Sequence, residues 1–209
     1  MAPVTSFRCS VGVTLLGVRV TAYAVINRAE HRRRQAARMG AVIDPGLLDR
    51  LLDLPVAVGV TDPVVWAEMA DQPPGIVERG RDDASVTRYL ESPLTIAHVV
   101  VAAAAGRALR AVQDASLFAG FTRRWVAAAR GRFPEAALLE AKVCGVGVLG
   151  AHRRVLLQAE QPVSVTVDGW SWLLEEKTYR HWLTIAGRTA RLQPLTEPGF
   201  QGEADSAFR

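Results

Sequence analysis

Cysteine, histidine and lysine are all scarce in this chain of 209 residues. The two cysteines, Cys9 and Cys144, are too few and too far apart in sequence to indicate a disulfide framework or a zinc site. None of the four histidines has a second histidine four positions away, the spacing that places two metal ligands on one helix face. These absences favour a protein of the reducing cytoplasm, and we expect no cofactor.

The scarcity of lysine leaves arginine as the dominant basic residue. Lys142 and Lys177 are the only lysines among 25 basic residues, so 23 are arginines. The net charge of +4 favours anionic partners weakly, because charge governs association rather than chemistry. Two interpretations stay open. The bias reflects the codon preference of a GC-rich genome, or it serves phosphate and carboxylate recognition, to which the planar guanidinium group is suited.

Familiar catalytic and nucleotide-binding signatures are also missing. The sequence has no Walker loop, no G-x-G-x-x-G between a strand and a helix, and no G-x-S-x-G nucleophile elbow. Nothing in it resembles a helix-turn-helix, a zinc finger or an RNA-recognition motif. The run from Cys144 to Gly147 contains two glycines, which we expect to mark a bulge or a close backbone approach within a strand.

A membrane segment is conceivable only at residues 9–26, which form an apolar run. Arg19 lies at its middle and costs roughly 2.5–3.5 kcal/mol on insertion scales. Apolar residues alternate with Arg19, Thr21 and Tyr23, which favours a half-buried strand over 18–26. We therefore expect no membrane association, with an anchor at 9–26 as the alternative.

Capping residues mark several helices in the N-terminal half. Asn27 and Glu30 form a capping box, and Gly40 ends the expected helix. Asp44 followed by Pro45 opens a second helix that turns its leucines inward. The further expected elements are a short buried strand over 55–60, a helix over 61–69, a loop over 71–83, a helix over 83–90, and a strand followed by a helix within 94–113.

The C-terminal third predicts an antiparallel meander between two helices. Asp168 caps the second helix, whose aromatic residues recur at helical spacing and are expected to pack in the core, with one tryptophan facing outward. The elements before it are a helix over 122–133, a long strand over 136–149, a turn over 150–153, and strands over 154–160 and 163–167.

Together these elements predict an α+β fold. We expect a flexible N-terminus at 1–8, one mixed domain over 9–186 with a loop seam near 71–83, and a disordered tail at 187–209. The three-stranded antiparallel meander flanked by helices forms its C-terminal part. An N-terminal strand and further helices complete it.

One constellation points to catalysis. Glu140 and Lys142 lie two positions apart on the expected strand 136–149, so both side chains share a face. The triplet resembles the E-x-K half of the PD-(D/E)xK nuclease superfamily. That resemblance implies a Mg²⁺-dependent nuclease with Glu140 and Lys142 as catalytic residues and Glu160, or else Asp114, as a second acid beside Glu140 on the metal. The alternative interpretation is a polar edge of a strand.

Two arginine-rich helices give the hypothesis of first choice, a non-catalytic module that binds nucleic acid or an acidic protein. Arginines on a helix face can neutralise phosphates and release counterions, independently of base sequence. A solvated exterior balanced by acids is the alternative. The candidate binding residues are Arg28, Arg32, Arg33, Arg34, Arg38, Arg123, Arg124, Arg130 and Arg132.

Overall fold

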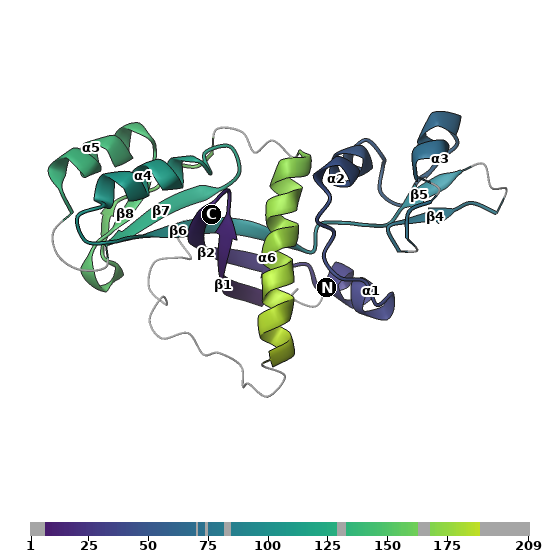
Figure 1. The fold of residues 1–209 in the computed structure, drawn as a ribbon, viewed down its shortest axis with the longest axis horizontal. Helices are drawn as coiled ribbons and strands as arrows, with labels where there is room; N and C mark the ends of the chain where they lie inside the picture. Colours follow the sequence, from purple (N-terminus) through teal and green to yellow (C-terminus); the bar gives the residue numbers. More distant parts are fainter. Residues whose placement is uncertain are drawn as a thin grey trace, which may run out of the picture.

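The chain folds as one α+β domain with two sheets. The computed structural model describes residues 7–69, 71–73, 75–81, 85–128, 133–162 and 168–188. A six-stranded mixed sheet and a three-stranded antiparallel sheet lie on opposite sides of the long helix α6 (Gly169–Arg188) (Figure 1).

The larger sheet has the order β1-β2-β6-β7-β8-β9. Strands β6, β7 and β8 are parallel to one another, and β1, β2 and β9 pair antiparallel at the two sides. The crossovers between the parallel strands are α4 (Ala108–Ser116) and α5 (Glu135–Val143). The strands are β1 (Phe7–Leu15), β2 (Val18–Ile26), β6 (Leu94–Ala103), β7 (Arg123–Ala128), β8 (Gly147–Leu149) and β9 (Val155–Leu157).

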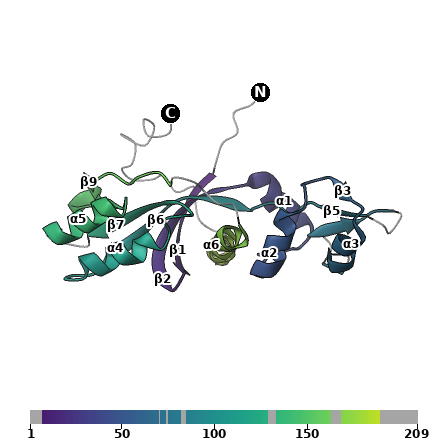
Figure 2. The ribbon, with the colours of Figure 1, turned by 90° about the horizontal axis from the view of Figure 1, so that it is seen from above.

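In the described part of the chain, α4, α5 and α6 all pack on the same face of this sheet. Alternate residues of the strands point to these helices and form one core with them, such as Val13, Val99 and Val126 with Val112 of α4 and Ala141 of α5. Figure 2 shows these three helices on the same side of the sheet. The strand residues between the core positions therefore point to the opposite side, which we call the open face.

The smaller sheet, in the order β3-β5-β4, belongs to a second core. Helix α6 supplies Trp172 and Leu173 to this core and Leu174 to the first one, so it joins the two halves of the domain. The remaining elements are α1 (Arg28–Ala36), α2 (Pro45–Leu52), β3 (Gly59–Val60), α3 (Pro63–Met69), β4 (Val77–Arg79), β5 (Val86–Arg88) and the short 3-10 helix η1 (Ala151–Arg153).

Side-chain caps begin three helices, α1, α2 and α6, where the sequence predicts them. Asn27 accepts a hydrogen bond from the backbone of Glu30 at the start of α1. Asp44 caps α2, and Asp168 accepts from the backbone of Ser171 in the first turn of α6. The predicted strand over 18–26 is β2, the region 94–113 is a strand followed by a helix, and the helix over 61–69 is α3.

The run 9–26 is not an anchor helix but a β-hairpin, formed by β1 and β2. Its turn is at Leu16 and Gly17, both with positive φ. Among the described residues, no helix is long and apolar enough to cross a bilayer.

The predicted meander is wrong. Residues 123–128 form a parallel strand rather than a helix, because Thr122 bonds to the carbonyl of Ile96 and leads the chain into pairing with β6. Residues 135–143 form α5 rather than a strand. The segment is rich in alanine, leucine and glutamate, which favour helix, and Gly145 with φ +64° follows its end.

Smaller corrections concern the neighbouring segments. The expected helix over 83–90 contains strand β5, and the loop over 71–83 contains β4. Of the strand expected at 55–60, Gly59 and Val60 form a strand and Val56 forms an isolated bridge to Arg88, and none of these three residues is buried. The turn at 150–153 is η1, and the strand after it is shorter than expected. The strand expected at 163–167 and the tail beyond residue 188 lie outside the described residues.

Candidate functional site

The arginine helix α1 turns one of its predicted contact residues into the protein interior. The side chain of Arg34 is fully buried. Its guanidinium forms two hydrogen bonds to Glu176 of α6, at 2.8 and 2.6 Å, and its Nε donates to Glu30 at 2.7 Å. The carboxylate of Glu176 also accepts from the backbone N–H of Val42. Arg34 therefore holds α1 against α6 and is unavailable to a partner.

Arg33 is also engaged within the protein. Two of its nitrogens donate to the Glu30 carboxylate, at 2.7 and 2.8 Å, and a third donates to the carbonyl of Gly75. Arg32 and Arg38 are exposed. The basic face expected on this helix is thus narrower than the sequence suggests.

The second arginine group is divided between the two faces of β7. Arg124 points into the core side, where it is buried and donates to the carbonyls of Cys144 and Ala119. Arg123 points to the open face, because side chains alternate along a strand. Arg130 and Arg132 lie outside the described residues.

The residues that suggested a nuclease are on a helix, not on a strand. Glu140 and Lys142 belong to α5, where two positions correspond to a rotation of about 200°, so they point to opposite sides. Glu160 is on the exposed segment after β9, and Asp114 pairs with Arg110 on α4. Across the described part of the chain, no three acidic, histidine or cysteine side chains come together as a metal site. The geometry on which that hypothesis depended is absent.

The open face of the large sheet carries a row of polar and aromatic side chains. Strand pairing places Ser10, Tyr23, His98 and Arg123 side by side across β1, β2, β6 and β7. The rings of Tyr23 and His98 are stacked, with centroids 4.5 Å apart and an angle of 16° between their planes. Ser10, small and exposed, is the neighbour of Tyr23 on β1.

Positive charge surrounds this pair of rings. Burial, together with the charges of Arg123 and Arg8, lowers the pKa of His98 to about 4. The imidazole is therefore neutral at pH 7. Arg8 on β1 is exposed, and Arg123 on β7 is half-buried. The two guanidinium groups supply the charge, while the rings supply a neutral stacking surface.

Trp125 extends the aromatic surface along β7. It pairs with Val100 on one side and Gly147 on the other. A Cβ at Gly147 would overlap the indole ring of Trp125, so only glycine allows the ring to lie over β8. The row of Tyr23 and His98, together with Arg8, Arg123 and Trp125, is called the platform below.

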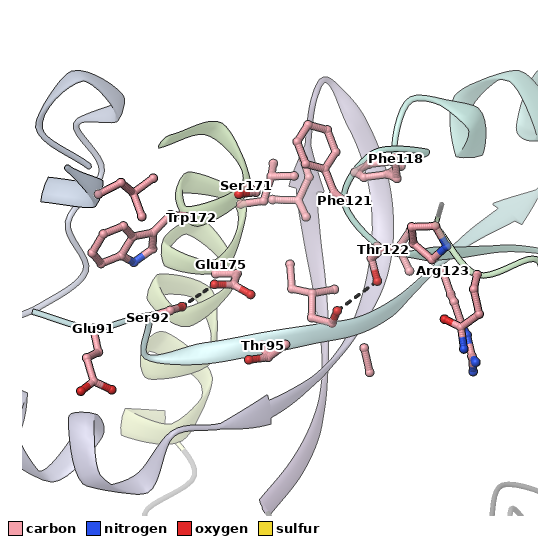
Figure 3. Close-up of a pocket in the computed structure, with 18 of the residues that line it drawn as sticks. Glu91, Ser92, Thr95, Phe118, Phe121, Thr122, Arg123, Ser171, Trp172 and Glu175 are labelled. Carbon is pink, nitrogen blue, oxygen red and sulfur yellow. Dashed lines mark hydrogen bonds between the residues drawn. The ribbon is translucent and has the colours of Figure 1, made fainter. Parts of the chain in front are cut away.

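A cavity of about 460 Å³ lies beside the platform, between β6 and α6 (Figure 3). Pairing between β6 and β7 begins at His98, so the stretch of β6 before it has a free edge, and this edge faces the cavity. Trp172, Phe118 and Phe121 contribute apolar walls, and Arg123 lines one end.

Glu175 of α6 is the acidic group inside this cavity. Its carboxyl group accepts a hydrogen bond from the Ser92 hydroxyl and one from the backbone of Ile96. Burial raises its pKa to about 7, against the lowering effect of these bonds. Ser92 also contacts the carbonyl of Leu94, at 2.8 Å. A hydroxyl has one proton to donate. When Glu175 is protonated, it donates to Ser92 and Ser92 donates to the carbonyl of Leu94. When Glu175 is ionised, it competes with that carbonyl for the Ser92 proton.

The sequence contains only part of the signal for these groups. The alternation over 18–26 identifies Tyr23 as an outward residue of a strand, but nothing local pairs it with His98, 75 positions away. The aromatic residues of α6 are largely in the core as predicted, and Trp170 is the tryptophan that faces outward, with 57% of its surface exposed. No sequence pattern identifies Glu175 as a candidate site residue, because its position in a cavity is created by tertiary packing.

No protein-family model matches this chain, and no curated protein or solved structure is significantly similar to it.

Proposed function

We propose that this protein binds single-stranded nucleic acid on the open face of its large sheet, as a non-catalytic module. The observation that carries the proposal is the stacked pair of Tyr23 and His98, with Arg8 and Arg123 close enough to lower the pKa of the histidine. The platform replaces the arginine helices as the contact surface, because Arg34 and Arg124 are buried in the protein.

The chemistry of the platform suits unpaired bases and their phosphates. An aromatic ring offers a stacking face to any base, and such stacking contributes roughly 1–3 kcal/mol per base. Guanidinium groups neutralise phosphates and release counterions. The neutral His98 ring and the Tyr23 ring stack without adding charge, while Arg8 and Arg123 lie on either side of them.

A sheet surface favours single strands over duplex. Readout of duplex DNA needs a helix or ribbon that enters a groove, whereas rings displayed on a sheet contact bases that are already unstacked. A strand laid across the platform meets rings on β2, β6 and β7 in turn. An acidic protein would use the arginines but would leave the rings without a role.

The test is fluorescence anisotropy with a labelled oligothymidylate of about 12 nucleotides, titrated at several salt concentrations. We expect Tyr23→Ala to weaken binding roughly 5- to 150-fold, the equivalent of one lost stack. Arg123→Gln should weaken it and reduce the slope of log K against log salt by about 0.7, the effect of one lost phosphate contact.

Arg32→Gln is the matched control, since Arg32 is an exposed arginine of α1, a helix that contributes no residue to the platform. It should leave affinity and slope within error of the parent, and thermal unfolding should show that all three variants are folded. Absence of binding at low salt would refute the proposal. So would a loss in the Arg32 variant equal to that in the Arg123 variant, which would restore α1 as the contact surface.

A further inference from the structure

We propose that the cavity between β6 and α6 takes one unpaired base with two adjacent N–H donors, the pattern of guanine, and that Glu175 accepts both of them. This inference rests on the proposed function, since it supplies base selectivity to a module that otherwise binds any single strand. It concerns the cavity alone, so it can be tested apart from the platform.

The acceptor capacity of Glu175 fits a base of this kind. An ionised carboxylate offers about four acceptor positions. The Ser92 hydroxyl and the backbone N–H of Ile96 occupy two of them, so two remain. Within the described residues, no arginine, lysine or histidine forms an ion pair with Glu175. Guanine presents an imino and an amino N–H side by side on one edge, which matches the two remaining positions.

The walls of the cavity suit a flat, apolar ring. Trp172, Phe118 and Phe121 line the cavity, and Figure 3 shows Trp172 on one side of Glu175 and the two phenylalanines on the other. Extruded bases are typically held in this way, with apolar or aromatic side chains against the ring faces and hydrogen bonds at the base edge. A volume of about 460 Å³ holds a single base with its sugar.

The cavity and the platform are connected through Arg123. This residue lines the cavity and is also the neighbour of His98 in the row across the sheet. A strand bound to the platform therefore passes the entrance of the cavity at Arg123, and one nucleotide can turn into it while its phosphate stays beside the guanidinium group.

The protonation state of Glu175 provides an independent readout. Burial raises the pKa of Glu175 to about 7, with Glu176 adding to the rise. The other charged groups that line the cavity are Arg88 of β5, Glu91 and Arg123. Only the ionised carboxylate accepts two further hydrogen bonds, so selectivity should grow as the pH rises from 6 to 8.

The experiment compares oligothymidylates that carry one central guanine, hypoxanthine or adenine, at constant salt and pH 8. Hypoxanthine lacks the amino group, and losing one hydrogen bond to a charged acceptor should cost roughly 10-fold or more in affinity. We expect guanine to be preferred over both other bases. Glu175→Gln should abolish the preference, so that the oligonucleotides with guanine, hypoxanthine and adenine bind with similar affinity.

Glu91→Gln is the matched control, because it makes the same chemical change in an exposed residue of the same cavity. It should keep the preference for guanine. Equal affinities for guanine and hypoxanthine in the parent would overturn the inference, as would a preference that survives Glu175→Gln.

Calorimetry of the binding of free guanosine monophosphate tests this inference separately from the proposed function. It also shows whether the ligand of the cavity is a free nucleotide or part of an oligonucleotide. If no oligonucleotide binds but the nucleotide binds in a manner that depends on Glu175, the cavity is a nucleotide site and the platform proposal fails. If oligonucleotides bind without base preference and the nucleotide does not bind, the platform stands and the cavity inference is refuted.

Discussion

Replacement of Arg34 by methionine should destabilise the protein more than any other single change on α1. The side chain is fully buried and holds two carboxylates, those of Glu30 and Glu176. It also donates to the carbonyls of Gly40 and Glu91. Methionine fills part of the space but leaves Glu176 buried without a cation, whereas Glu30 keeps its pairing with Arg33.

The expected magnitude follows from this geometry. Removing one partner of a buried ion pair typically costs 3–5 kcal/mol, because the remaining charge stays desolvated. Typical domains have free energies of unfolding of only about 5–15 kcal/mol, so the loss is a large share of the total. For a protein of this size it corresponds to a fall of roughly 6–20 °C in the melting temperature.

Urea unfolding followed by tryptophan fluorescence measures the effect, with Arg32→Met as the control on the same helix. The exposed Arg32 variant should lie within about 0.5 kcal/mol of the parent. The double variant Arg34→Met with Glu176→Gln should recover part of the loss, because the unpaired charge of Glu176 is gone. If Arg34→Met were as stable as Arg32→Met, Arg34 would not be buried in an ion network, and our reason for rejecting α1 as the contact surface would fail.

Three further predictions concern the sheet, the titrating groups and the nuclease alternative. Gly147→Ala should cost roughly 1–3 kcal/mol in urea unfolding, because its Cβ overlaps the ring of Trp125. Glu175 has a folded-state pKa near 7, above its ordinary value, so its contribution to the free energy of unfolding should fall by up to about 3 kcal/mol as the pH rises from about 4.5 through 7. Glu175→Gln should remove this contribution. His98, with a pKa of about 4, acts in the opposite direction, because its contribution to stability is lost as the pH falls from 6.5 through 4. The two effects oppose each other, so urea midpoints at pH 5, 6 and 7.5 should change little in the parent. In Glu175→Gln the midpoints should rise with pH. Supercoiled plasmid incubated with Mg²⁺ should be nicked no more by the parent than by Glu140→Ala, since the side chains that a nuclease requires do not converge.

Local signals in the sequence were sufficient for the starts of α1, α2 and α6 but not for the parallel strands or for α5 between them. Asn27, Asp44 and Asp168 each bond to a backbone N–H within three residues, so their role is readable from neighbouring residues alone. The segment 123–128 is a strand because β6 and β8 pair with it on both sides, and those partners are distant in sequence. Its alanines and arginines carry little strand propensity of their own.

The candidate site was hard to predict for the same reason. Arginine composition indicated basic helices, but the burial of Arg34 depends on Glu176, 142 positions away. The platform depends on a bulge between β2 and β6 that aligns Tyr23 with His98. The outward position of Tyr23 follows from alternation along a strand, whereas its partner ring and the cavity at Glu175 come from tertiary packing.

The most direct test of nucleic-acid binding on the open face is an NMR titration of the labelled protein with oligothymidylate at low salt. The account predicts chemical-shift changes at the amides of β1, β2, β6 and β7 and at the Trp125 indole N–H, with those of α1 unaffected. Changes confined to α1, or none on the sheet at saturation, would contradict it.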